Sequence, residues 1–247
     1  LVEAARRPAT PELSLVVLPF ENLSPDPDNA FFADGLTEEI IAALTKVRAL
    51  RVISRTSAML LRGSKKDVPT IARDVNVRYV LEGSVRRAGN SLRITAQLID
   101  GATDAHLWAE RYSGTLDDVF DLQERLARSI VEELKIALAP DESRRLGVRA
   151  TSDPRAYELW LRVMHESRQL TKEGAERALQ MVNQALATFG DDALLHSAVA
   201  YIHYVSYDFW FSHDEETLRR SEDAAARALA LNPELSQAAL SMALVWY

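Results

Sequence analysis

The sequence predicts an α+β protein in which an α/β module is followed by an all-α module of helical repeats. In the first half, short apolar runs rich in β-branched residues alternate with segments of helical periodicity. The second half shows helical periodicity alone and contains a repeated segment. The composition allows both modules to bury a core, because the 247 residues are 47% hydrophobic and 26% charged, which excludes global disorder.

Composition also excludes several classes of protein. The absence of Cys rules out a disulfide framework, a thiolate nucleophile, and a Cys-based zinc or iron–sulfur site. Nine Gly and nine Pro are too few for collagen-like or low-complexity architecture. The net charge of −7 is unevenly spread, since Lys46–Arg93 holds twelve basic and three acidic residues. This asymmetry indicates either a binding surface for an anionic partner or solvent-exposed basic residues that balance acidic helices in the same protein. We favour the solvent-exposed interpretation.

The first elements follow from local patterns. Residues 1–12 are charged and Pro-bearing, as in a linker. Leu13–Phe20 is a short apolar run typical of a buried strand, and Glu21–Asn29 has the composition of a loop. A helix follows, capped either by Asn29 or by Thr37. Its apolar face is formed by Leu36, Ile40, Ile41, Leu44 and Val47.

A β-hairpin is the clearest local feature. Before it, Arg51–Ser54 predicts a short strand and Thr70–Val75 a short helix. Val77–Val85 and Leu92–Asp100 both alternate apolar and polar residues, which predicts two half-buried strands. Gly89-Asn90 between them supplies the two positive-φ residues of a tight turn.

A third strand and a long helix complete the module. His106–Tyr112 predicts the strand, and Thr115–Asp118 resembles a capping box with Asp in place of Glu. A helix of about 23 residues follows and ends before Pro140. Its apolar stripe comprises Leu116, Val119, Phe120, Leu126, Ile130, Leu134 and Leu138. The polar segment Asp141–Asp153 is the expected linker, and it separates domains at 13–140 and 154–247.

The second domain contains an internal repeat. Gln184–Ala187 recurs as Arg227–Ala230, 43 residues later, and a helix breaker follows each copy. Small residues at such positions let paired helices approach closely, as in a helical solenoid. The pattern resembles tetratricopeptide (TPR) repeats, although the spacing exceeds the usual ~34 residues, and a third repeat starts at Ser236. Ala193–Phe211 is about as long as a membrane span needs to be, but its polar residues favour a buried helix in this repeat.

Six ordered motifs resemble one family, the TolB amino-terminal-domain-like module of bacterial signalling proteins. They are Leu18–Ser24, Phe32–Glu39, Arg51–Ser57, Tyr79–Val85, Arg93–Asp100 and His106–Glu110. The resemblance implies a mixed sheet with packed helices from about Leu13 to Pro140, followed by TPR repeats. It also implies a regulatory part of a larger chain, with a cyclase, Ser/Thr kinase or CadC-like DNA-binding domain upstream. We therefore expect the chain to be truncated at both ends.

We expect no catalytic activity and no cofactor. The five His form no His-Glu-x-x-His pair, and the chain has no Gly-x-Ser-x-Gly elbow, Gly-rich phosphate loop or dinucleotide fingerprint. His196 and His203 lie seven residues apart without a carboxylate at ligand spacing between them, so core or groove positions are favoured over metal ligation.

Binding is the expected activity. The concave face of stacked helix pairs would take a protein or peptide partner. The candidate groove residues are Trp160, Met164, Leu195, Val199, Ile202, His203, Leu240 and Leu244. Apolar residues at helical spacing are also ordinary core, and both interpretations stay open. A small-ligand pocket in the first domain would use Arg55 and Arg86 as anion contacts, whereas nucleic-acid binding is not favoured.

The sequence thus predicts a non-catalytic regulatory or scaffold region that couples a partner or ligand to an attached effector, with self-association as an option. The alternatives are the regulatory part of an adenylate cyclase or Ser/Thr kinase, or a free-standing envelope assembly factor. The sequence does not distinguish a cytoplasmic from a periplasmic location. Either location is compatible with tethering to the inner membrane through a segment outside this sequence.

Overall fold

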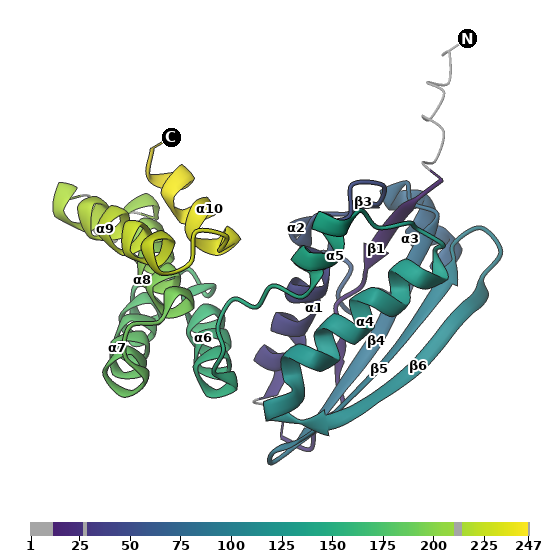
Figure 1. Cartoon of the computed structure of the whole chain (residues 1–247), viewed down its shortest axis with the longest axis horizontal. Coiled ribbons are helices and arrows are strands. Elements are labelled where there is room, and N and C mark those ends of the chain that lie inside the picture. The colour runs from purple at the N-terminus through teal and green to yellow at the C-terminus, as the bar shows by residue number, and fades with distance from the viewer. Residues whose placement is uncertain (1–11, 27–28, 210–213, 247) are drawn as a thin grey trace, which may run out of the picture. The chain divides into compact units, whose positions relative to one another are not determined.

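The computed structural model describes residues 12–26, 29–209 and 214–246. The chain forms two compact units, Leu1–Val148 and Arg149–Tyr247, and each is described by itself (Figure 1). Nearly all of the expected N-terminal linker, residues 1–11, lies outside the described residues.

A mixed sheet forms the centre of unit 1. Its strands are β1 (Ser14–Val17), β2 (Glu21–Asn22), β3 (Arg51–Val52), β4 (Tyr79–Ala88), β5 (Ser91–Asp100) and β6 (Ala105–Thr115). The strand order is β3-β1-β4-β5-β6, and β2 pairs with β4 beside this path. The pairs among β1, β2, β3 and β4 are parallel, while β4, β5 and β6 form an antiparallel meander.

Helices α1 (Ala30–Thr45) and α4 (Val119–Glu133) cover one face of this sheet (Figure 1). Unit 1 also contains α2 (Arg55–Met59), α3 (Val68–Val75), a 3₁₀ turn (Leu116–Asp118) and α5 (Pro140–Leu146). Helices α1 and α4 pack against each other and against the strands, as Figure 1 shows. The largest fully buried side chains under them include Phe32, Leu36, Leu81, Ile94, Leu98 and Tyr112. The chain is thus an α+β protein with a mixed sheet.

The hairpin prediction is confirmed, with one correction to its turn. Strands β4 and β5 pair in register from Tyr79 opposite Asp100 to Ala88 opposite Ser91. Gly89 has a φ of 58°, but Asn90 does not take a positive φ. A positive φ at the first central position alone is the pattern of a type II′ turn, which matches strand twist as well as type I′ does.

Two helix boundaries differ from expectation. Helix α1 begins directly after Asn29, and Thr37 lies inside it, so Thr37 is not the cap. The Thr37 hydroxyl instead donates to the Ala33 carbonyl at 2.8 Å and accepts the Phe20 N–H at 3.0 Å. Helix α4 ends at Glu133, well before Pro140, because Lys135 adopts a left-handed φ of 53°. A left-handed residue cannot continue an α-helix, although the apolar stripe extends beyond it.

The capping box at Thr115 is confirmed, since the Thr115 N–H donates to Asp118 Oδ2 at 2.7 Å. The segment expected to be a linker begins instead with helix α5. Its Glu142 is buried and accepts hydrogen bonds from the backbone N–H groups of Arg48 and Ala139. These bonds tie the start of the segment to unit 1.

Unit 2 is all-α. Its helices are α6 (Pro154–Ser167), α7 (Lys172–Phe189), α8 (Ala193–Asp208), α9 (Glu215–Leu231) and α10 (Ser236–Val245). Helix α6 packs on α7, α8 packs on α9, and α10 packs on both α8 and α9. Small side chains line these contacts, because Ala178, Ala185, Ala198, Ala225 and Ala228 are all 0–1% exposed.

Gly190 ends α7 with a φ of 78°, and α9 ends just before Asn232 and Pro233. Within the described residues, no helix has the length and hydropathy needed to cross a membrane. Helix α8 covers most of the membrane candidate Ala193–Phe211, and nine of its side chains are buried in unit 2.

Candidate functional site

The open face of the unit 1 sheet carries a cleft of about 600 Å³. It lies where β1 ends, between the segment leading into β2, the segment joining α2 to α3, and strands β4 and β5. Glu82, Ser84, Thr95 and Gln97 project into it from the sheet, and Arg62 and Lys66 line it from the segment before α3. The cleft is therefore formed from segments far apart in the sequence.

Strand alternation explains why the cleft floor is polar. Leu81, Gly83 and Val85 pair with Leu98, Ala96 and Ile94 and face the core under α1 and α4. The intervening residues must point to the opposite face. Gln97 Nε2 donates to Glu82 Oε2 across β4 and β5 at 3.0 Å, which holds the one carboxylate that β4 contributes.

Phe20 is among the lining residues of the cleft, and it packs on β4 from the core side of the sheet. Its ring packs on Gly83, where a Cβ would lie 2.5 Å from Cε2 and Cζ of the ring. Only glycine permits this approach. The missing side chain at Gly83 leaves space on the core side that the Phe20 ring fills, and strand alternation alone does not identify that ring.

Both basic side chains that line the cleft have carboxylate partners. Lys66 Nζ lies 2.7 Å from Asp74 Oδ2, and Arg62 Nη2 lies 2.5 Å from Asp34 Oδ1. These pairs join the α2–α3 segment to α1 and α3, and they leave little of the cleft's own positive charge uncompensated.

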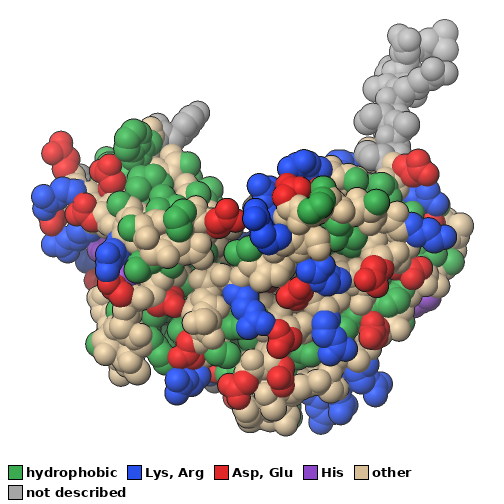
Figure 2. Space-filling model, in the orientation of Figure 1, with side chains coloured by type: hydrophobic (Ala, Val, Ile, Leu, Met, Phe, Trp, Pro, Cys, Tyr) green, Lys and Arg blue, Asp and Glu red, His purple; other side chains and the backbone are tan. Residues whose placement is uncertain are grey.

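Beyond the cleft, the same face of the sheet presents three exposed arginines, Arg86, Arg93 and Arg111, which we call the arginine face. Arg86 on β4 is directly opposite Arg93 on β5, and Arg111 on β6 is opposite Thr95. Within the described parts of the chain, the side chains of these three residues have no ion pair or hydrogen bond. On the other side of unit 1, over α4 and α5, basic and acidic side chains are interspersed (Figure 2).

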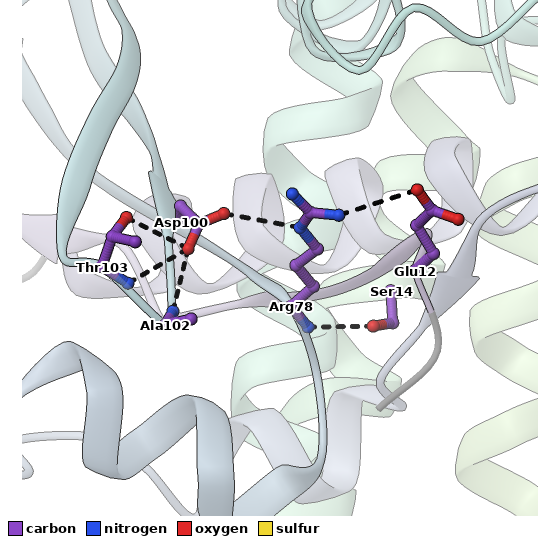
Figure 3. A network of polar contacts seen from close by, with 6 residues as sticks. All are labelled: Glu12, Ser14, Arg78, Asp100, Ala102 and Thr103. Atoms are coloured by element: carbon purple, nitrogen blue, oxygen red, sulfur yellow. Dashed lines mark hydrogen bonds and ion pairs between the residues drawn. The ribbon is translucent and has the colours of Figure 1, made fainter. Parts of the chain in front are cut away.

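A separate polar network stabilises the opposite end of the sheet (Figure 3). Asp100 Oδ1 accepts hydrogen bonds from the N–H groups of Ala102 and Thr103 and from the Thr103 hydroxyl, while Oδ2 lies 3.4 Å from Arg78 Nε. Burial acts to raise the Asp100 pKa, but these hydrogen bonds outweigh it and lower the pKa below its ordinary value. The network ties the β5–β6 turn to β4, so its role is structural.

The two predicted anion contacts do not meet in the cleft. Arg55 begins α2, with its Nε 3.1 Å from Glu38 Oε2, whereas Arg86 belongs to the arginine face. Neither residue lines the cleft. Sequence reasoning missed Arg93 and Arg111 as neighbours of Arg86, although hairpin register would have placed Arg93 there.

The candidate groove residues of unit 2 divide by burial. Four are core residues at 0–8% exposure: Trp160, Met164, Leu195 and Ile202. Side chains so buried cannot touch a partner unless unit 2 rearranges. Val199, His203 and Leu244 are half-buried, and Leu240 is 58% exposed. A partner surface on unit 2 would therefore use the second group alone.

The histidines of α8 have different environments. Desolvation lowers the pKa of His203, and the positive charge of Arg220 lowers it further. His196 Nε2 lies 2.7 Å from Asp191 Oδ1, and Arg227 of α9 contacts the same carboxylate, which lowers the Asp191 pKa to about 2. In the described part of the chain, no cluster of three or more His, Asp and Glu could hold a metal ion.

The chain is similar to one family model and to one curated relative. A model of the family described as "HilA/YgeH-like transcriptional regulator, second domain" matches residues 11–129. "Putative adenylate cyclase 3" of Rhizobium meliloti (strain 1021) is 38% identical over 242 residues, which is 97% of this chain. The chain spans 41% of the length of that relative.

Two solved structures are similar to part of this chain. Lipoprotein GNA1162 from Neisseria meningitidis covers 51% of this chain and 99% of its own, with 18% identity and a TM-score of 0.37. TolB from Acinetobacter baumannii covers 52% of this chain and 29% of its own, with 14% identity and a TM-score of 0.38.

Proposed function

We propose that the chain is a non-catalytic regulatory region of a bacterial multidomain signalling protein. In this proposal, it binds a protein partner or ligand and couples that binding to an attached effector. The observation that carries the proposal is the relative named an adenylate cyclase, which matches nearly all of this chain with less than half of its own length. The match to a transcriptional-regulator domain supports the same regulatory role with a different effector.

Unit 2 supplies the partner surface in this proposal. Its successive helix pairs and buried small residues support assignment to TPR-like repeats, with α6–α7 and α8–α9 as two repeats and α10 opening a third. The accessible contact positions are Val199, His203, Leu240 and Leu244. Leu240 is the most exposed of the four and is the position where a charge would disturb binding most without disturbing the core.

Four aspartates with lowered pKa values support a non-catalytic role. Asp67 and Asp118 cap helices, Asp100 closes a turn, and Asp191 joins α8 to α9. Their hydrogen bonds hold these carboxylates ionised, whereas a general acid or base usually has its pKa moved toward neutrality. We therefore propose that any enzymatic activity of the whole protein belongs to another domain.

Two measurements test the proposal. The purified 247-residue chain should form no cyclic AMP from MgATP, whereas product formation by this chain would refute the non-catalytic assignment. In the protein that contains this chain, deletion of residues 13–247 should change the regulated output of the effector, and unchanged output would contradict the regulatory role.

A pair of point variants tests the unit 2 surface. Leu240→Asp should weaken regulation of the effector, because it places a charge on the proposed contact face. Leu170→Asp is the matched control, since Leu170 is 41% exposed and belongs to the α6–α7 connection, not to the helices α8 and α10 that carry the proposed contacts. Equal effects of both variants would show that the response does not depend on the proposed surface.

A further inference from the structure

The arginine face adjoins the polar floor of the cleft, and together they form one surface. Thr95 lies at its centre, directly opposite Ser84 on β4 and Arg111 on β6. Arg93 and Gln97 flank Thr95 on the same face of β5, each about 7 Å away along the strand. Ser84 and Thr95 of the cleft are therefore the immediate neighbours of the arginines in the sheet.

The positions of these arginines destabilise the fold when no ligand is bound. Like charges directly opposite each other on antiparallel strands are destabilising, and Arg86 and Arg93 form such a pair. The neighbouring Arg87 points to the other face, where it donates to the Gly89 carbonyl and lies over the Phe32 ring. Arg86, Arg93 and Arg111 have no comparable contact among the described residues, so their charges are available to an anion.

The donors on this surface match a phosphate group. Guanidinium groups bind phosphate oxygens through paired N–H donors, and the Ser84 and Thr95 hydroxyls add neutral donors within the same area. Neither hydroxyl has a hydrogen-bond partner in the parts of the chain that the structure describes. Cross-strand and diagonal neighbours on a sheet are about 5–8 Å apart, so long arginine side chains can converge on one group.

Two carboxylates at the cleft end restrict which chemical groups the ligand can carry there. Glu82 lies on the cleft floor, and Glu21 of β2 is the register neighbour of Ser84 and lines the same cleft. These carboxylates would repel a second phosphate but accept hydrogen bonds from hydroxyl groups. A cleft of about 600 Å³ has room for a small organic body.

We propose that this surface binds a small soluble phosphate ester. Its phosphate lies among Arg86, Arg93 and Arg111, and its hydroxyl-bearing body occupies the cleft beside Glu82 and Gln97. This site belongs to unit 1 and is independent of the partner surface proposed on unit 2.

Calorimetric titration of the full chain at low ionic strength tests the proposal with two probes, inorganic phosphate and ribose 5-phosphate. Ribose 5-phosphate should bind roughly tenfold more tightly, because only its hydroxyls reach the cleft. The double variant R86Q/R93Q should lower the affinity for both probes by about tenfold or more, because each substitution removes a charged guanidinium donor. E82Q should reduce the preference for ribose 5-phosphate and leave phosphate binding unchanged.

The matched control is R144Q/R145Q, which removes the same charge from exposed positions on α5 of the same unit. The control should bind both probes as the unaltered chain does. Absence of binding at millimolar concentrations of either probe, or equal losses in the two double variants, would overturn the proposal. Tighter binding of a short DNA duplex that depends on Arg86 and Arg93 would also overturn it, in favour of a nucleic-acid surface.

Discussion

Gly83→Ala tests the packing of Phe20 on strand β4. The new methyl group would lie 2.5 Å from two carbon atoms of the Phe20 ring. Carbon atoms in ordinary contact are about 3.5 Å apart, so the ring must retreat by roughly 1 Å. Phe20 has little freedom to do so, because it is 2% exposed and its N–H is held by the Thr37 hydroxyl.

Overpacking of this kind costs about 1–3 kcal/mol, and the intrinsic gain of alanine over glycine in a strand offsets up to about 1 kcal/mol. We expect Gly83→Ala to lower the free energy of unfolding of unit 1 by about 1–2 kcal/mol, as measured by urea dependence of hydrogen exchange at β4 and β5 amides. Ser84→Ala, the adjacent residue on the open face, should stay within about 0.5 kcal/mol of the unaltered chain.

A double-mutant cycle identifies the contact responsible. Phe20→Leu removes ring atoms next to Gly83 and should cost about 1–3 kcal/mol by itself. In the double variant, the alanine methyl group fills part of that space, so adding Gly83→Ala should cost little further stability. Additive losses, or a Gly83→Ala variant as stable as the unaltered chain, would refute the packing argument.

Three further predictions concern buried or paired ionisable groups. Asp100→Ala should cost about 2–3 kcal/mol at neutral pH, because it removes an acceptor of several hydrogen bonds. Since the folded-state pKa of Asp100 is lowered, this contribution is present above the unfolded pKa and is lost as the pH falls through the folded one, so urea unfolding at acid pH should show a smaller difference. Asp191→Asn should make unit 2 less sensitive to acid between the ordinary pKa of 3.8 and about 2, which circular dichroism of an acid titration would detect. Tyr112→Phe removes a hydroxyl that donates to Glu110 Oε2 at 2.8 Å, and it should cost about 1 kcal/mol. Burial raises the Tyr112 pKa to about 12, so its contribution is present below pH 10 and is lost above about 12, which absorbance titration of the phenol would follow.

Elements that depend on neighbouring residues could be predicted from the sequence. The β4–β5 hairpin and the capping box at Thr115 involve groups within a few residues of each other, and both were predicted at the right positions. The ends of helices were harder. The apolar stripe after Thr115 continues to Leu138, yet α4 stops at Glu133, because periodicity records which residues are apolar and carries no information about backbone φ at Lys135.

Candidate contacts were harder still, because burial and proximity depend on distant segments. Trp160 and Leu195 have the pattern of a groove and also that of a core, and only packing between helices shows that they are buried. Arg55 and Arg86 share a basic segment of the sequence, but one pairs with Glu38 and the other lies on an open sheet face.

The sequence by itself determined the alternation of strands and helices in unit 1, the pairing of β4 with β5 in a hairpin, and the helical character of unit 2. Each of these follows from the periodicity of hydrophobic residues and from local turn chemistry. Only the tertiary structure decided that Phe20 folds onto Gly83, that a cleft opens beside it, and that Arg111 joins Arg86 and Arg93 on one face. These features appear only when the β1, β4, β5 and β6 segments pack together. Residues so far apart in the chain are brought close by packing of the core, which local sequence patterns do not record.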